Sequence, residues 1–167
     1  MTFYDLVTKL FLHLHPGCPP GFLLQMPQRQ VASCIPAAIK YLEDIYHSGV
    51  IDISKEDNYD EEEDEEEKLV LTKEDLVLIK EIVEYTTKLN EPDSKTTKFL
   101  EEIMKIQQNG KIKRLIVFSF FKRTLKYLER KLHEIGIFVY RMDGDVPFDE
   151  RETLLRHCQE IIIAKLI

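Results

Sequence analysis

Apolar residues recur at helical spacing through the first 50 positions of the chain. Over Phe3–Leu14 they fall three or four positions apart, and Pro16-Gly17 follows as a stop signal. A second stripe runs over Val31–Tyr46 and ends near Gly49. Pro36 interrupts this stripe, which predicts either a kinked helix or a helix that begins there. A helix cannot bury its own apolar stripe, so we expect both segments to pack on other elements.

Two more helices are predicted before position 110. Thr72 and Asp75 have the spacing of a capping box with Asp in the usual Glu position, and an apolar stripe follows them until Pro92. Asp93 can cap the second of these helices, and Asn109-Gly110 ends it.

The pattern changes after position 114. Leu115–Phe118 is an unbroken run of apolar residues, typical of a strand that is buried on both faces. The segments that follow predict a helix over 125–135, a strand over 137–142, a helix over 149–158 and a strand from 161. This alternation predicts a parallel sheet with right-handed crossovers and an α/β fold class. We expect Ile161–Ile167 to form a partly covered edge of that sheet.

Charge is distributed unevenly along the 167 residues. The net charge is −7, but Glu56–Glu67 alone contributes −10, and the chain from Asp93 onward holds 15 basic and 11 acidic residues. The eight consecutive carboxylates over Asp60–Glu67 repel one another and offer no apolar face. They predict a disordered linker over 52–68, in which Asp57–Glu67 is a mobile surface loop. One alternative function for the protein is a non-enzymatic interaction module, in which this acidic run binds a basic partner or shields the protein's own basic groove.

The organisation predicted from these patterns has four parts: a helical segment over 1–51, an acidic linker over 52–68, a helix over 69–92 and an α/β domain over 93–167. Three scattered cysteines do not form a disulfide framework. No apolar run approaches the roughly 18–20 residues of a membrane span, and no signal peptide opens the chain. We therefore expect a soluble, cytoplasmic protein without a membrane partner.

Motifs for nucleotides and metals are sparse. No two of the six glycines have the spacing of a phosphate-binding loop. His13 and His15 would point about 200° apart on a helix, so they do not form a zinc site with Cys18. Asp143-Gly144-Asp145 allows two interpretations. It is either a tight turn in which Gly144 supplies an unusual backbone angle, or a divalent-metal site for a sugar nucleotide, as in glycosyltransferases.

A basic helix face follows the first predicted strand of the α/β domain. Lys122, Arg123, Lys126 and Arg130 fall at helical spacing, and the N-terminus of their helix is where backbone amides favour phosphate. The face is either a phosphate-binding surface or an ordinary solvated surface.

Three stretches of this region resemble a known family. They are KRLIVFSFFKRTL over Lys113–Leu125, YRMDGDVP over Tyr140–Pro147, and Glu150-Arg151. Together they resemble the start of the second RecA-like lobe of Swi/Snf-type helicase-like ATPases. Asp93-Ser94-Lys95 is similar to that family's lead-in, and Met26–Cys34 is similar to the helical segment that bridges the lobes in prokaryotic members.

The resemblance implies an incomplete RecA-like half-lobe from a nucleic-acid translocase. It implies a nucleic-acid groove that binds double-stranded DNA weakly. It also implies a second partner, the first RecA-like lobe of the family. The residues that match the groove are Ser119, Lys122, Arg123, Arg141, Gly144 and Arg151. One departure is Phe120, where many members carry Gln.

Catalysis in that family needs parts that this sequence does not match. The phosphate-binding loop and the acidic metal-binding motif belong to the first lobe, and the arginine finger belongs to a later stretch of the second lobe. ATP and magnesium are cofactors of the intact family members. We therefore expect this chain to be a fragment that has no catalytic residues, holds no cofactor or metal by itself, and does not hydrolyse ATP.

Overall fold

The chain forms two compact units, Met1–Glu91 and Pro92–Ile167. The computed structural model describes residues 2–14, 25–52, 68–89, 93–109, 115–144, 146–157 and 161–165. The predicted mobile loop over 57–67 lies outside the described residues, as do His15, Cys18 and Asp145.

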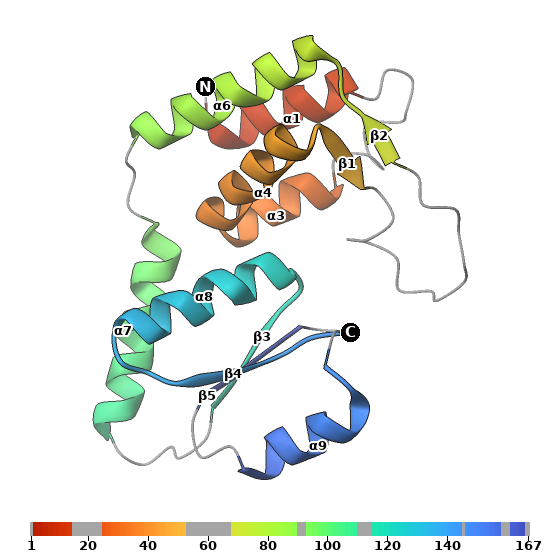
Figure 1. The fold of residues 1–167 in the computed structure, drawn as a ribbon. Helices are drawn as coiled ribbons and strands as arrows, with labels where there is room; N and C mark the ends of the chain where they lie inside the picture. Colours follow the sequence, from red (N-terminus) through yellow and green to blue (C-terminus); the bar gives the residue numbers. More distant parts are fainter. Residues whose placement is uncertain are drawn as a thin grey trace. The chain divides into compact units, whose positions relative to one another are not determined.

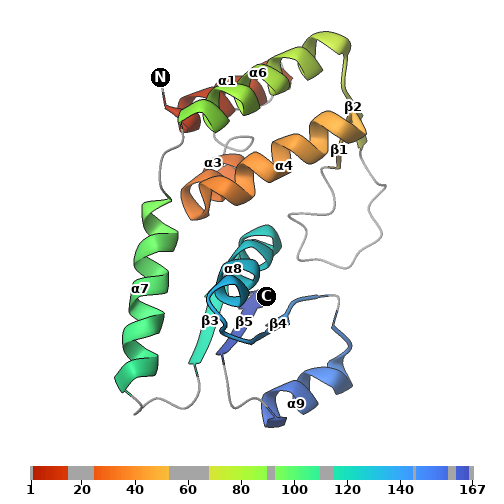
Figure 2. The same ribbon diagram turned by 60° about the vertical axis from the view of Figure 1, so that its left-hand side comes forward.

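The first unit is mainly helical (Figure 1). Its elements are α1 Phe3–Leu14, α3 Gln25–Ser33, α4 Ile35–Ser48, β1 Val50–Asp52, β2 Lys68–Val70 and α6 Lys73–Leu89. Leu10, Leu42 and Ile79 are almost completely buried and bring α1, α4 and α6 into one core. The neighbouring positions of α1 and α6 are visible in Figure 2. The predicted apolar stripes therefore do pack on other elements.

The predicted helix stop and start signals explain where α4 begins and ends. Pro36 occupies the first turn of α4, where a missing N–H costs nothing, so the second alternative is correct and a new helix begins there. Gly49 follows the helix with φ of 70°, and its N–H donates to the carbonyl of Ile45 at 2.8 Å. This left-handed conformation suits glycine and satisfies one carbonyl of the last turn.

The reciprocal cap predicted for α6 is present. The Thr72 N–H donates to Asp75 Oδ2 at 2.8 Å, and the Asp75 N–H donates to Thr72 Oγ1 at 3.2 Å. The cap predicted at Asp93 is present too, because its Oδ1 accepts a hydrogen bond from the Thr96 N–H at 3.2 Å.

Two short strands of the first unit were not predicted. β1 and β2 pair antiparallel, with Val50 opposite Val70 and Asp52 opposite Lys68. The predicted boundaries of the acidic linker and of the helix over 69–92 thus fall on strand residues. Strands of three residues are too short for an alternating pattern to show in the sequence.

The second unit has the predicted alternation of strands and helices. Its elements are α7 Ser94–Asn109, β3 Leu115–Ser119, α8 Lys122–Glu134, β4 Val139–Met142, α9 Phe148–His157 and β5 Ile161–Lys165. The three strands form a parallel sheet in the order β3-β5-β4 (Figure 1). The α/β class is confirmed, and membership of a RecA-like half-lobe stays a prediction.

The strand order contradicts the prediction that Ile161–Ile167 forms an edge. β5 lies between β3 and β4, with Leu115 and Val139 both paired to Ile161. After β3 the chain forms β4 at the opposite edge of the sheet, and the central position between them is filled last, by β5. The edges of the described sheet are therefore β3 and β4.

The prediction that the first strand is buried on both faces is also wrong. Leu115 and Val117 face a core that includes Ile103 of α7 and Leu125 of α8. Ile116 and Phe118, which point to the opposite face, are 46% and 58% exposed. Both α7 and α8 thus contribute to burying the same side of β3.

Candidate nucleic-acid interface

The residues that the resemblance assigns to the groove come from four consecutive elements of the second unit. Ser119 ends β3, Lys122 begins α8, Arg141 lies in β4 and Arg151 lies in α9. The strands are parallel, so the segments after β3 and β4 leave the sheet at the same end. The fold therefore brings the carboxyl ends of these two strands to the same end of the sheet.

An ion cluster lies at this end of the sheet. Asp143 follows β4, and its side chain is 0% exposed. Its Oδ1 lies 3.9 Å from Lys122 Nζ, and its Oδ2 contacts Arg141 Nη1. Arg141 Nε also donates to Glu129 Oε2 of α8 at 3.1 Å. We call Lys122, Glu129, Arg141 and Asp143 the sheet-end cluster; its two formal positive and two formal negative charges cancel.

The sequence marked Lys122, Arg141 and Asp143, but it missed Glu129 and the pairing of Asp143 with the two cations. Arg141 and Asp143 are two positions apart at the end of a strand, so their side chains point to the same side. That spacing was a usable signal for the pair. Glu129 could not be found in this way, because its contact depends on how α8 packs on β4.

Arg151 is directed at the backbone of the loop after β4. Its Nε donates to the carbonyl of Val146 at 2.8 Å, and its Nη2 lies 3.4 Å from the Asp143 carbonyl and 3.5 Å from the Gly144 carbonyl. The Val146 N–H in turn donates to the Asp143 carbonyl at 3.1 Å and closes a turn. In this conformation Arg151 holds the shape of the loop.

Gly144 differs from the sequence-based expectation. Among the described glycines a positive φ occurs at Gly49 and Gly136, and Gly144 has none. A Cβ built on Gly144 would meet no atom within 4 Å. The turn interpretation holds, but an unusual backbone angle is not the reason for this glycine.

The end of β3 turns sharply into α8. The Phe121 N–H donates to Ser119 Oγ at 3.3 Å, so the serine hydroxyl stabilises the turn. The rings of Phe120 and Phe121 pack edge to face with centroids 5.3 Å apart. Phe120 thus contributes an aromatic contact to this turn.

The first turn of α8 is electrostatically unusual. Phe121 supplies no side-chain cap, and the turn holds no acidic residue. It carries instead Lys122 and Arg123, which are both half-buried. Positive charges at a helix N-terminus oppose the helix dipole, and a bound anion would relieve that repulsion.

Further along α8, Arg130 and the neighbouring Lys131 have intramolecular partners. Arg130 Nε lies 3.8 Å from Glu134 Oε1, and the Arg130 guanidinium lies over the Tyr127 ring at 5.4 Å from its centroid. Lys131 donates to Glu134 Oε2 at 2.7 Å, and this hydrogen bond lowers the pKa of Glu134. Lys126 is exposed. The cationic side chains of α8 thus run from Lys122 and Arg123 in its first turn to Lys126 and Arg130 further along the helix.

The metal-site interpretation needs both Asp143 and Asp145, and of these two the structure describes Asp143. The Asp143 carboxylate is buried and already contacts the cationic side chains of Arg141 and Lys122. Two neighbouring cations repel a divalent ion. Among the described residues no group of three acidic, histidine or cysteine side chains could hold a metal ion.

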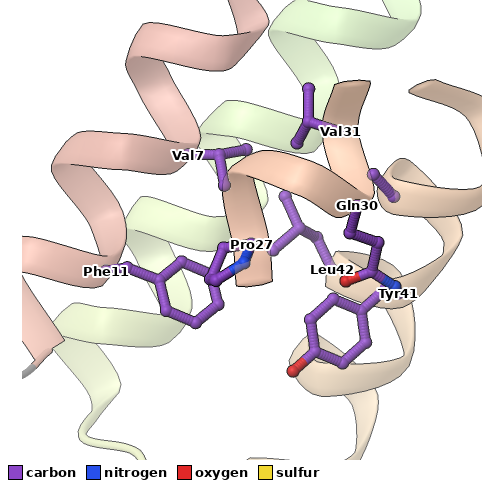
Figure 3. Close-up of a pocket in the computed structure, with 8 residues that line it drawn as sticks. Val7, Phe11, Pro27, Gln30, Val31, Tyr41 and Leu42 are labelled. Atoms are coloured by element: carbon purple, nitrogen blue, oxygen red, sulfur yellow. The ribbon is translucent and has the colours of Figure 1, made fainter. Parts of the chain in front are cut away.

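A small cavity in the first unit is too small to be a ligand site. It lies beneath Phe11, Pro27, Gln30 and Tyr41, and Figure 3 shows mainly apolar side chains around it. Its volume of about 10 Å³ has room for roughly one water molecule. No helix in the part of the chain that the structure describes is long and apolar enough to cross a bilayer.

Comparison with known proteins gives one structural match. The sequence matches no protein-family model, and no curated protein sequence matches it significantly. A crystal structure of the Pyrococcus furiosus Hef helicase domain is similar over 98% of this chain, with 16% sequence identity and a TM-score of 0.47. This chain spans 43% of the length of that helicase domain.

Proposed function

We propose that the unit Pro92–Ile167 contributes part of the nucleic-acid groove of a Swi/Snf-type helicase-like ATPase. On this proposal the chain binds double-stranded DNA weakly and without sequence preference. The observation that supports it is the grouping of Lys122, Arg141 and the loop after β4 at one end of a parallel sheet. The residues that match these by motif lie along the nucleic-acid groove in the family that the sequence resembles.

The cationic and N–H groups at this end of the sheet suit the binding of a phosphate backbone. Lys122 and Arg123 stand in the uncapped first turn of α8, where N–H groups and cationic side chains both attract anions. Contacts of this kind recognise charge rather than base sequence. Each neutralised phosphate releases counterions, so the binding constant falls steeply as salt rises.

Charge reversal at the first turn of α8 tests the proposal. We expect Lys122→Glu combined with Arg123→Glu to weaken binding of a labelled random-sequence duplex. The slope of log K against log salt should become shallower by about 1 for each phosphate that the protein no longer neutralises. Lys98→Glu combined with Lys105→Glu is the matched control, because it makes the same charge change on exposed positions of α7.

The two double variants must differ for the proposal to stand. Equal losses of affinity in both would mean that only the net charge of the chain attracts DNA. Unchanged affinity and salt slope in the Lys122/Arg123 variant would show that the groove lies elsewhere.

The proposal includes the absence of ATP hydrolysis by this chain alone. Phosphoryl transfer needs a phosphate cradle, a metal site and a charge-stabilising arginine together. The sequence holds no glycine loop of the required spacing, and the Asp143 carboxylate is committed to Arg141. We expect no ATPase activity above background, with or without DNA. DNA-stimulated turnover that persists through repurification would contradict this part of the proposal.

A further inference from the structure

The sheet-end cluster places a fully buried carboxylate beneath the cations that face the proposed groove. Asp143 contacts Arg141 directly and lies 3.9 Å from Lys122 Nζ. We infer that Asp143 competes with nucleic-acid phosphate for Lys122, so that a phosphate binds there by taking the ammonium group away from this carboxylate. The inference rests on the proposed function and adds a control of affinity at the same site.

Arg141 is the fixed cation of the cluster. Its Nε donates to Glu129 of α8 at 3.1 Å while its Nη1 contacts Asp143 after β4. The planar guanidinium thus links a helix to the end of a strand through two acids. Turning it toward a ligand would leave two acidic groups without their shared cation, one of them buried.

Lys122 is the cation that can exchange partners. Its ammonium lies near the outer limit of an ion pair with Asp143, and its side chain is 31% exposed. A lysine carries a compact charge on a flexible four-carbon stem, so the ammonium can swing toward solvent while its backbone stays in α8. Arg141 remains in place to neutralise Asp143 when Lys122 leaves.

The competition follows from the signs of the charges. A phosphate that reached Lys122 in its present position would also approach the negative charge of Asp143. Like charges at short range in a partly buried site repel strongly. Movement of the ammonium away from Asp143 removes that repulsion, so affinity depends on how firmly the carboxylate holds Lys122.

A double-mutant cycle on the full chain tests this inference. Wild type, Asp143→Asn, Lys122→Gln and the double variant are titrated with labelled random-sequence duplex DNA at several salt concentrations. We expect Asp143→Asn to tighten binding by about two- to five-fold, the range of a partly exposed ion pair. In the Lys122→Gln background the same substitution should give a much smaller gain.

Glu129→Gln is the matched control. It removes one carboxylate from the same cluster and changes the net charge equally. Like Asp143, Glu129 contacts Arg141, but the ion pair of Lys122 within the cluster is with Asp143. The inference would be wrong if Asp143→Asn and Glu129→Gln raised DNA affinity equally and this increase persisted in the Lys122→Gln background. Weaker DNA binding by a folded Asp143→Asn variant would also overturn it. Wild-type binding with no coupling between Asp143 and Lys122 would reject the competition alone. If neither wild type nor Asp143→Asn binds, the proposed function fails as well.

A measurement on the wild-type chain covers the case in which Asp143→Asn does not fold. The carboxyl carbon resonance of Asp143 reports the groups around the carboxylate. We expect it to shift when duplex DNA is added, in the direction that Lys122→Gln produces without DNA. A resonance that does not move at saturating DNA would show that Lys122 keeps its contact with Asp143, and the inference would be wrong.

Discussion

His13 Nε2, at the end of α1, lies 3.2 Å from Asp75 Oδ1, in the first turn of α6. The other oxygen of the same carboxylate accepts hydrogen bonds from the N–H and hydroxyl of Thr72 at 2.8 and 2.7 Å. One side chain therefore caps α6 and contacts α1. These hydrogen bonds, mainly that of the Thr72 hydroxyl, and the nearby His13 hold the pKa of Asp75 below its ordinary value.

We expect Asp75→Asn to destabilise the first unit by about 1 kcal/mol, the usual size of a helix-cap contribution. An amide oxygen can accept the same two Thr72 hydrogen bonds, but without the charge of the carboxylate these bonds are weaker. Amide hydrogen exchange in α6 measures the loss of stability within this unit. Glu84→Gln is the control, because it removes an exposed charge from the same helix that lies 3.7 Å from Lys80. A destabilisation by Glu84→Gln equal to that by Asp75→Asn would contradict the capping role.

The contribution of Asp75 should depend on pH in a defined direction. The lowered folded-state pKa means that the unfolded chain takes up the proton first as pH falls. The stabilisation is therefore complete above the ordinary aspartate range and disappears as pH falls through the folded-state pKa. The difference between wild type and Asp75→Asn should shrink over that acidic interval. A difference that stays constant down to the lowest pH would show that the charge of Asp75 is not what stabilises the cap.

Gly136 and Gly144 allow a matched test of backbone conformation. Neither has an atom within 4 Å of a built Cβ, but Gly136 has φ of 77° and Gly144 has no positive φ. We expect Gly136→Ala to cost about 1–2 kcal/mol, because L residues resist the left-handed region. Gly144→Ala should leave the exchange rates of α8 and β4 amides unchanged. An equal destabilisation in both variants would contradict this difference.

The same Gly144→Ala protein then tests how closely a ligand approaches the loop. If a DNA backbone packs on Gly144, the added methyl group weakens binding although the fold is intact. We expect that result when the variant and wild type are titrated with the same labelled duplex. Full affinity would remove Gly144 from the proposed groove.

Local patterns predicted most elements of the second unit. The apolar run at Leu115–Phe118 and the helical stripe that starts near Leu125 each fall within one element, so their periodicity is visible in sequence. The position of β5 between β3 and β4 was missed, because strand order depends on contacts between distant segments. The exposed face of β3 was missed for a related reason. An apolar run does not indicate how many helices will cover it.

The candidate site was predictable where it depends on topology. Ser119 and Arg141 lie near the ends of parallel strands, so their presence at one edge follows from the strand directions. The contacts that Arg141 makes with Glu129 and that Arg151 makes with the Val146 carbonyl depend on side-chain packing. The family resemblance assigned both arginines to the nucleic-acid groove without showing that each also makes contacts within the protein.

Arg151 should prove essential for the loop after β4 because of its fork of donors. We expect Arg151→Lys to increase the exchange rate of the Val146 amide, since an ammonium cannot reach the three carbonyls in the same geometry. Arg156→Lys on the exposed side of α9, where Arg156 contacts Glu152, is the control and should have little effect. Unchanged protection of Val146 in Arg151→Lys would mean that the turn holds its shape without the guanidinium.

The two faces of the sheet should respond differently to removal of side-chain volume. Leu125 is fully buried between α8 and the sheet, so Leu125→Ala should cost about 2–5 kcal/mol. Phe118 is 58% exposed, so Phe118→Ala should cost less than about 1 kcal/mol despite the larger deletion. Exchange protection of β3 and α8 amides separates these changes from any in the first unit. An equal cost for Phe118→Ala and Leu125→Ala would mean that the outer face of β3 is covered in solution. It would contradict the difference between the two faces of the sheet.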